Sequence, residues 1–585
     1  MNLKRLKSLS NIVINHSYFS LFVYSILFTA ISYVSMNTSS QIYDYPFHLA
    51  RIIGLSQSIK NNDWLPNLNY LFLNGAGYGV PMFYGNWMFY LPALVFLLTK
   101  IGTLAFASFV WLLTFATACT SYFTVFKITG SKIRALLFAI VAPTLLTYFG
   151  FGMTAVAPLI PLLIYAIYKV LYLNELNPIL LAIVVALLVQ THIISTVVLA
   201  ISSVIFVLFN ITKLTIKKVL SFLYSIIIAI FLSLGFIFQY FEQIQSQTFF
   251  VNWKLRDFPF PTAALMTSES LKNIIQNYYF PMSLIILVIA IVFLRKLNTL
   301  SKQLIFLSVI LLICSSEILP WESFLKYSFL AIFQYTTRLV YFLPIFIFMA
   351  ICISAPKKLT GAVVLVQLIF YLIANPFAFQ PNTSNYANKY GLVDSNINVM
   401  RNQNSKASNA FENPIMTTYD TSGDEYLNLS VNHENARNGV INQFEYNKDL
   451  VQVKNVKQGY NNLEFDVKLR TSDAQDIVLP RIWYKGYVAY YSNGGKGSQP
   501  KIEYSKLSKD EKEQYKEARK PTVSQKALYD GRAVIKIDNS GHVKITYQKT
   551  TIQIIGFMLE LISFIIVITY VVVKFFKYRD VNYVK

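Results

Sequence analysis

Long apolar runs separated by short basic segments make up most of the first 378 residues. Crossing the apolar core of a bilayer takes about 20 apolar residues. Runs of about this length occur at 18–36, 103–126, 135–151, 156–173, 218–241, 279–294, 303–319, 335–354, 359–378 and 551–573. The pattern therefore predicts a polytopic α-helical membrane protein.

The apolar stretch 178–210 is too long to be a single span. As one helix, it would extend to about 50 Å, against an apolar core of about 30 Å. Basic segments lie on both sides of it, so it is expected to cross twice, with a break near Gln190–His192. The total is then twelve spans.

Basic segments between the runs predict the orientation. They are Lys127–Arg134, Lys213–Lys218, Arg295–Lys302, Lys357–Lys358 and Lys574–Arg579. Cytoplasmic loops collect Lys and Arg, so we expect these segments inside, with both termini cytoplasmic, in a plasma-membrane protein. This requires the apolar segment 86–101 to lie along the outer face rather than to span. Tyr84, Trp87 and Tyr90 suit such an interfacial position.

Composition agrees with a membrane protein. Hydrophobic residues make up 55% of the chain and charged residues only 14%, against about 25% in soluble proteins. The net charge of +22 is compatible with nucleic-acid binding, but basic cytoplasmic loops explain it as well, and we expect no nucleic-acid partner. The first apolar run follows a basic N-terminus without a small-residue cleavage site, so we interpret it as a retained span.

Three segments are expected outside: 37–102, 242–277 and 379–550. The last is rich in Asn, Ser, Lys and Tyr, with little periodicity up to about 445 and a charged run at Ser505–Lys520 that suits a surface helix or loop. Alternating runs follow at Asn462–Leu469, Ile477–Tyr484, Tyr487–Tyr491, Ala533–Asp538 and His542–Tyr547. They predict an antiparallel β-sandwich of about 100 residues. The expected domains are 1–378, with the first outer loop, then 379–550, then a last helix and basic tail at 551–585.

The first outer loop carries candidate chemistry. Asp44, His48 and Arg51 are spaced i, i+4 and i+7, so a helix would present all three on one face. An acid, an imidazole and a guanidinium at the mouth of the membrane domain suit a general base with supporting groups. The alternative is an Asp that stabilises a helix N-terminus, with His and Arg on a solvated face.

A glycine-rich segment follows, Asn74-Gly75-Ala76-Gly77-Tyr78-Gly79-Val80-Pro81. It lacks the Lys-Ser/Thr and the preceding strand of a phosphate loop, so the nucleotide interpretation is weak. Its glycines either let the backbone approach a ligand or form a tight turn, and the local sequence favours the turn.

Two further candidates lie near predicted outer ends of spans. His192 follows Gln190-Thr191 at the hairpin, where a single His is either structural or functional. Gln334 and Arg338 follow Leu319-Pro320-Trp321. Arg338 either reaches the interface from within the span or binds a phosphate through its fork of donors.

Several chemistries lack a motif in this sequence. There is no HExxH, GxSxG, P-loop or Asp-x-Asp element, and the last absence argues against a metal–nucleotide sugar donor. The 3 Cys lie in apolar runs and the 5 His are scattered. We therefore expect neither a metal site nor a cofactor.

The order of these motifs resembles a known family. The pattern comprises Asp44-x-x-x-His48-x-x-Arg51, Trp64-x-Pro66, Asn74-Gly75-x-Gly77-Tyr78-Gly79, Phe83-Tyr84-Gly85, Gln190-x-His192-x-x-Ser195, Leu319-Pro320-Trp321, Gln334-x-x-x-Arg338, Glu425-Tyr426-Leu427 and Trp483-Tyr484-x-Gly486-Tyr487. It resembles bacterial membrane proteins of the GT-C glycosyltransferase superfamily. Within this superfamily it is similar to the YfhO-type proteins and to the large membrane proteins labelled 6-pyruvoyl-tetrahydropterin synthase-related. The resemblance covers nearly the whole chain.

This resemblance implies a GT-C-like fold and an inverting sugar transfer at the outer face. The implied donor is a polyprenyl-phosphate sugar, and the implied acceptor is an envelope glycopolymer or glycolipid such as teichoic or lipoteichoic acid. Asp44 would be the base, His48 would orient it, and Arg338 with Arg51 would hold the phosphate. The remaining expected substrate-binding residues are Asn74, Tyr78, His192 and Gln334.

The sequence also departs from this family. Relatives carry an Arg and a Gly-Glu pair after the third span, where 148–155 is uncharged here, and Asn428 replaces a usual Pro. Altered substrate choice or lost activity would follow. A flippase is a second hypothesis, but it predicts charges at the membrane midplane, whereas these lie at the outer rim. A non-catalytic envelope-assembly scaffold is a third, and the uncharged 148–155 favours it.

Overall fold

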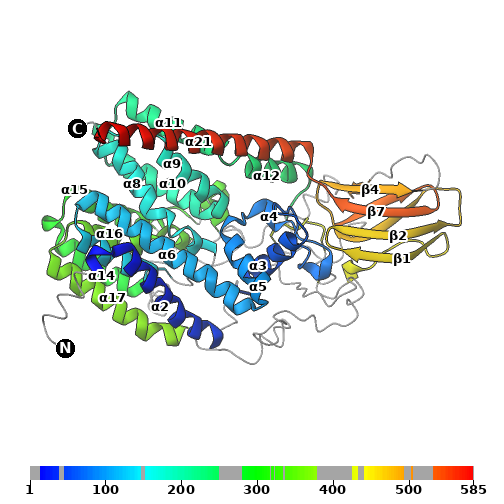
Figure 1. The fold of residues 1–585 in the computed structure, drawn as a ribbon, viewed down its shortest axis with the longest axis horizontal. Coiled ribbons are helices and arrows are strands. Elements are labelled where there is room, and N and C mark those ends of the chain that lie inside the picture. The colour runs from blue at the N-terminus through cyan, green and yellow to red at the C-terminus, as the bar shows by residue number, and fades with distance from the viewer. Residues whose placement is uncertain are drawn as a thin grey trace.

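A computed structural model gives the fold of the chain. It describes residues 13–38, 45–146, 152–249, 280–316, 318–321, 323–333, 336–378, 425–431, 436, 440–492, 502–504 and 531–583. The described part is mostly helical, with a separate β region at one end (Figure 1). The expected combination of apolar helices with a β-rich region is therefore confirmed.

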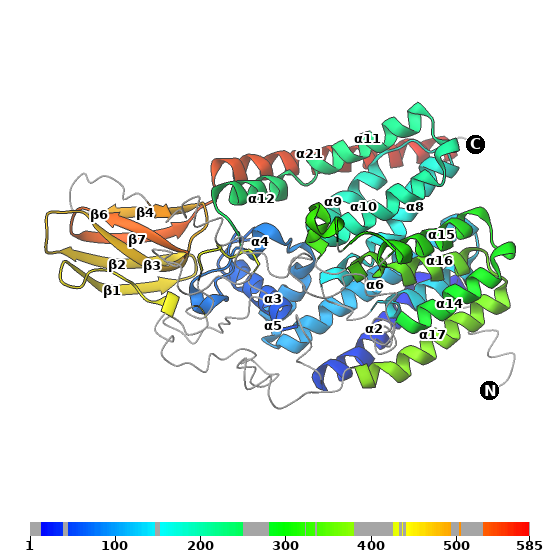
Figure 2. The ribbon, with the colours of Figure 1, turned by 180° about the vertical axis from the view of Figure 1, so that it is seen from behind.

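The helices follow the apolar runs. They are α2 (Ser17–Thr38), α3 (Tyr45–Lys60), α4 (Val80–Phe83), α5 (Tyr90–Thr99), α6 (Gly102–Thr129), α7 (Lys132–Val141), α8 (Leu159–Tyr172), α9 (Ile179–Thr191), α10 (Ile193–Leu208), α11 (Ile216–Phe231), α12 (Leu234–Ser246), α14 (Phe280–Val292), α15 (Thr299–Cys314), α16 (Leu343–Ser354), α17 (Lys357–Ala378) and α21 (Thr551–Tyr583). Short 3-10 turns include η1 (Leu73–Gly75), η2 (Trp87–Phe89), η4 (Gly152–Val156) and η10 (Thr336–Val340). In both views, α21 runs from the β region along α12 and α11 (Figure 1, Figure 2).

Four segments are long and apolar enough to cross a membrane: Leu104–Thr129, Gly152–Tyr172, Thr336–Ser354 and Thr551–Lys574. A fifth is counted if α11 and α12, bent by 68° at their junction, form one broken span. Shorter apolar helices of 10–17 residues cover several other predicted runs. These helices indicate membrane association, while the twelve-span topology and the orientation of the termini stay predictions.

Two details of the predicted topology can be compared with the helices. The expected break near Gln190–His192 coincides with the end of α9 and the start of α10. Helix α5 has 10 residues, or about 15 Å, which is too short for a bilayer core. Two of its flanking aromatic residues have polar partners within the protein: Trp87 Nε1 donates to Thr191 Oγ1 at 3.0 Å, and the Tyr90 hydroxyl donates to the Trp64 carbonyl. The interfacial position of this segment stays a prediction.

The β region contains two antiparallel sheets. One has the order β1 (Val451–Gly459), β2 (Asn462–Leu469), β7 (Gly541–Tyr547), β4 (Tyr487–Ser492), and the other has the order β3 (Gln475–Ile482), β6 (Arg532–Ile537), β5 (Ile502–Tyr504). Buried residues such as Phe465 and Ile545 from the first sheet share one core with Ile477 and Ile535 from the second. The five predicted runs match β2, β3, β4, β6 and β7 within two residues at each end, and no predicted run corresponds to β1 or β5.

The first outer loop joins the β region in a single hydrophobic core. Backbone and side-chain donors from β3 bond the glycine-rich segment: Ile482 N donates to Ala76 O at 3.1 Å, and Arg481 Nη1 donates to Gly75 O at 3.1 Å. A Cβ on Gly79 would lie 2.5 Å from the Tyr484 ring. This glycine is therefore required for the close approach of an aromatic residue from the β3–β4 turn.

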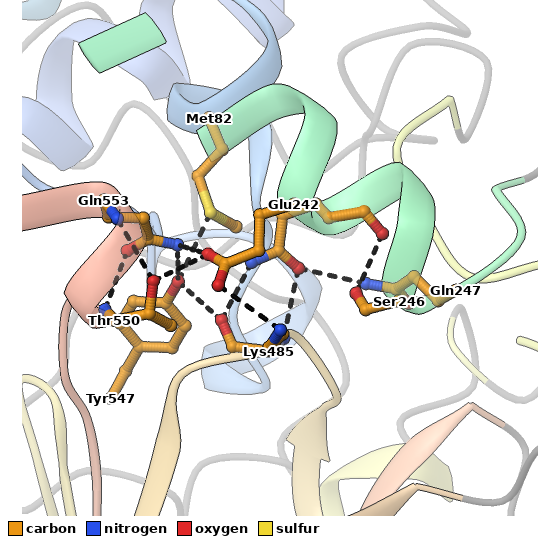
Figure 3. Close-up of polar contacts among 9 residues, drawn as sticks. Met82, Glu242, Ser246, Gln247, Lys485, Tyr547, Thr550 and Gln553 are labelled. Atoms are coloured by element: carbon orange, nitrogen blue, oxygen red, sulfur yellow. Dashed lines mark hydrogen bonds and ion pairs between the residues drawn. The ribbon is translucent and has the colours of Figure 1, made fainter. Parts of the chain in front are cut away.

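A polar cluster, here called the joint, fastens that same turn to α12 and α21 (Figure 3). Lys485 lies at the turn, and the Gln243 side chain bonds both its N–H (3.1 Å) and its carbonyl (2.8 Å). The buried Glu242 carboxylate accepts from Thr550 Oγ1 (2.7 Å) and Gln553 Nε2 (3.1 Å) and lies 3.4 Å from Lys485 Nζ. The joint therefore holds the β region firmly against the helices.

Candidate functional site

Helix α3 carries two of the predicted site residues on its buried face. His48 and Arg51 are each only 2% exposed, and the spacing i, i+3 places them side by side. Helices α5 and α6 pack against α3 and enclose this face. Asp44 directly precedes α3 in the sequence and lies outside the described residues.

The Arg51 guanidinium holds the turn that follows α4. Its Nη2 donates to the carbonyls of Tyr84 and Gly85, both at 2.8 Å, and to Asn86 Oδ1 at 3.2 Å. The guanidinium carbon lies 3.9 Å from the centre of the Tyr84 ring, a close cation–π contact. Burial lowers the pKa of Arg51 to about 10, so the group stays charged at neutral pH.

His48 lies between the Gly152 N–H and the Arg51 guanidinium. Its Nε2 accepts from the Gly152 N–H at 3.2 Å, and its Nδ1 lies 3.4 Å from Arg51 Nη1. Burial, and then the charge of Arg51, lower the pKa of His48 well below its usual value. His48 is therefore a neutral imidazole that links α3 to η4.

The Tyr84 ring lies between His48 and His192 and contacts both. Its centre lies 6.0 Å from the His48 ring and 5.5 Å from the His192 ring. A Cβ on Gly152 would lie 2.2 Å from the Tyr84 hydroxyl, so only glycine fits there. His192 caps α10, with Nδ1 accepting from Ser195 N at 3.1 Å.

Arg338 belongs to this group by its charge. It lies in η10, and its guanidinium acts electrostatically on His192. Arg51 acts on His192 in the same way. His48, Arg51 and His192 thus lie around Tyr84, and the charge of Arg338 acts on His192 from a third stretch of sequence.

A small cavity lies beside His48 and Arg51, and neither His192 nor Arg338 is among the described residues that line it. His48, Arg51, Tyr84, Gly152 and Thr191 line it, together with Gly85, Trp87, Met88, Phe89, Phe109 and Ala155. Its volume of about 10 Å³ has room for about one water molecule. No carboxylate is among the described residues that line it, so its electrostatic character is cationic.

The other predicted site residues lie elsewhere or outside the description. Tyr78 is fully buried, and its hydroxyl donates to the Glu425 carbonyl, so it lies at the contact with segment 425–431 rather than in the cavity. Asn74 lies in η1, in the glycine-rich segment. Gln334, like Asp44, lies outside the described residues.

Two residues near the cavity, Gly85 and Gln190, have contacts that the sequence alone does not indicate. A Cβ on Gly85 would lie 2.0 Å from the Gln190 carbonyl, so this glycine lets α9 meet the Tyr84–Asn86 turn. Gln190 Nε2 donates to the Leu232 carbonyl at 2.9 Å and to Glu560 Oε1 at 3.4 Å. The break after α9 is therefore tied to the junction of α11 and α12, a relation that the motif Phe83-Tyr84-Gly85 alone could not reveal.

Comparisons with protein-family models, curated proteins and solved structures find no match to this chain. Among the described residues, no group of three or more His, Cys, Asp or Glu is arranged to hold a metal ion. Function is therefore inferred from the chemistry of the cavity and from the motifs that converge on it.

Proposed function

We propose that this protein is an inverting GT-C-like glycosyltransferase of the plasma membrane. It moves a sugar from a polyprenyl-phosphate donor to an envelope glycopolymer or glycolipid on the outer face. The observation that carries the proposal is the convergence of His48, Arg51, His192 and the charge of Arg338 just beyond the first turn of α3. Asp44 immediately precedes that turn in the sequence.

The reaction needs one base and a cationic environment. Asp44 removes the proton of the acceptor hydroxyl, whose oxygen attacks the anomeric carbon of the donor sugar. The bond between that carbon and the phosphate oxygen breaks, and its electron pair leaves with the polyprenyl phosphate. The phosphate changes from a singly charged diester to a more negative monoester, so cations near it stabilise the transition state.

The described residues fit distinct parts of this step. Arg338 and His192 are the groups assigned to the departing phosphate, since a guanidinium binds phosphate through paired donors. Arg51 acts through its charge, because its Nη2 is already bonded to the Tyr84 and Gly85 carbonyls. His48 is neutral and bonded to Gly152, so it positions α3 rather than exchanging protons.

Transfer can be measured with the full chain in lipid nanodiscs, using a panel of polyprenyl-phosphate hexoses and total envelope extract as acceptor. Asp44→Asn should lower the transfer rate by about 10²–10⁴-fold, the usual effect of losing a general base. Arg338→Gln should lower it by about 10²-fold or more, since it removes charge stabilisation of the leaving group. Full activity of Asp44→Asn would remove the base from the mechanism.

A control variant is available on the predicted cytoplasmic side of the membrane, opposite to Asp44. Glu175 is an exposed carboxylate paired with Lys169 at 2.6 Å in the loop after α8. Glu175→Gln removes one negative charge, as Asp44→Asn does, and should leave transfer within about twofold of the wild type, because an exposed pair contributes little.

A non-catalytic scaffold is the second candidate. The small volume of the cavity and the engagement of Arg51 by backbone carbonyls favour it. It predicts no transfer by the wild type with any donor of the panel, together with retained binding of an envelope polymer by the outer region.

A further inference from the structure

The two sheets of the outer region differ in what covers their outer faces. Every residue of β3 from Ile477 to Ile482 is buried, so the three-stranded sheet is covered on both faces. In β2 and β7, buried residues alternate with exposed or half-buried ones, which leaves one face of the four-stranded sheet open. No described helix or strand lies over that face in either view (Figure 1, Figure 2).

Polar side chains form two cross-strand rows on this open face. The strand register pairs Lys454 with Asp466 and Asp466 with His542 in the first row. In the second row it pairs Lys457 with Glu464, Glu464 with Lys544, and Lys544 with Tyr490. Directly opposed residues of adjacent strands lie on the same face, so both rows point away from the core.

Both carboxylates of the face are hydrogen-bonded within it, and Glu464 is also paired with Lys544. Asp466 accepts from Asn455 Nδ2 at 2.6 Å and from His542 Nδ1 at 2.8 Å. Glu464 accepts from Asn462 Nδ2 at 3.1 Å and lies 3.1 Å from Lys544 Nζ. These hydrogen bonds, led by Asn455 and Asn462, lower the pKa of the two groups, so both are ionised and already engaged at neutral pH.

Three lysines of the open face take no part in these hydrogen bonds and ion pairs. Lys454, Lys457 and Lys468 are exposed, and within the described part of the chain none of them has an ion-pair partner. Four lysines, counting Lys544, against two carboxylates give the face a net charge of +2 with His542 neutral. Lysines on an edge strand discourage aggregation, which accounts for those on β1 but not for Lys468 on the inner strand β2.

We infer that the open face of the four-stranded sheet, presenting Lys454, Lys457 and Lys468, binds a phosphate-bearing anionic polymer. Charge complementarity selects this class of ligand, because the acidic groups of the face are satisfied internally and the cationic ones are not. The binding itself needs no catalysis. The identification of the polymer as the acceptor of sugar transfer rests on the proposed function.

The test uses the full chain in nanodiscs of zwitterionic lipid, with fluorescent poly(glycerol phosphate) as the probe and neutral dextran as the uncharged comparison. A triple variant Lys454→Gln, Lys457→Gln, Lys468→Gln removes the unpaired charges. A matched triple variant, Lys448→Gln, Arg470→Gln, Lys536→Gln, removes the same charge from exposed positions outside β1 and β2, the strands that carry the three test lysines. We expect the first to lose about tenfold or more in affinity and to show a weaker salt dependence, and the second to change less than about twofold.

Equal losses in both triple variants, or no binding of the probe by the wild type, would overturn the inference. Binding that the first triple variant abolishes, in a protein without transfer activity, would uphold the face and reject the glycosyltransferase. If the wild type transfers sugar but does not bind the probe, and the first triple variant transfers equally well, the glycosyltransferase is upheld and the binding face is rejected.

Discussion

Two buried polar clusters, the joint and the cavity, differ in charge balance. The joint contains a carboxylate, Glu242, whose oxygens meet a hydroxyl, an amide and an ammonium group. The cavity contains the charged Arg51, and none of the described residues lining it is a carboxylate. The first cluster is complete within the protein, whereas the second is an environment in which an anion would be stabilised.

This difference separates a structural role from a binding role. Burying a charge is unfavourable unless it is paired or hydrogen-bonded. The joint meets this condition with its own side chains, so it is expected to contribute stability and nothing else. Among the described residues, Arg51 meets it with carbonyl oxygens and aromatic rings, and no carboxylate of that part of the chain is paired with its charge.

The largest effect is expected from Arg51→Met. The substitution leaves the Tyr84 and Gly85 carbonyls without their donor, which should lower the free energy of unfolding by about 3–5 kcal/mol and abolish transfer. Arg51→Lys keeps the positive charge but lacks the planar pair of guanidinium donors, so it should recover only part of the stability that Arg51→Met loses. Thermal unfolding in detergent measures both, and a Met variant as stable as the wild type would show that this guanidinium does not hold the turn.

The contact between Gly79 and the Tyr484 ring gives the next largest effect. Gly79→Ala would place a Cβ 2.5 Å from the Tyr484 ring, and this overpacking should destabilise the protein by about 1–3 kcal/mol. The φ of Gly79 is −75°, so backbone strain is not the cause. Adding Tyr484→Leu should restore part of the loss, because it removes the ring. A double variant no more stable than Gly79→Ala would place the origin elsewhere.

Periodicity predicted the local elements of this fold. The strands β2, β4, β6 and β7 and the break between α9 and α10 lie where alternation and span length placed them, because both depend on neighbouring residues. The twelve-span topology is not settled by the helices, since only four, or five with the bent pair, have the length of a span among the described residues.

Contacts between residues far apart in the chain could not be predicted from the sequence. Gly79 and Tyr484 each stand in a recognisable motif, but nothing local indicates that one accommodates the other. The same holds for Glu242 and Lys485, and for Gln190 and Glu560. For the site, the face shared by His48 and Arg51 was predictable from spacing, whereas the approach of His192 through Tyr84 was not.

The joint itself should give a smaller effect. Glu242→Gln replaces one acceptor oxygen by a donor that faces the Gln553 amide, Thr550 or Lys485. Lys485 is 47% exposed, so solvent screens the pair and the expected loss is about 1–2 kcal/mol. Unlike Arg51→Met, this variant should keep transfer within about threefold of the wild type once folded, because the joint carries no binding role. A transfer loss larger than the loss of folded protein would contradict that assignment.

The smallest expected effect is a pH dependence of the folding stability, which arises from His48 at the cavity. The pKa of His48 is lowered in the folded protein, so between about pH 6.5 and that lowered value the unfolded chain binds a proton that the folded chain does not. Stability attributable to this group is therefore present above about pH 6.5 and falls as the pH drops, by about 1 kcal/mol at pH 5.5. Thermal unfolding of the wild type and of His48→Gln at pH 7.5 and 5.5 measures the difference. The variant should lose less stability on acidification than the wild type. Equal losses in the two proteins would mean that the His48 imidazole is not held neutral beside Arg51.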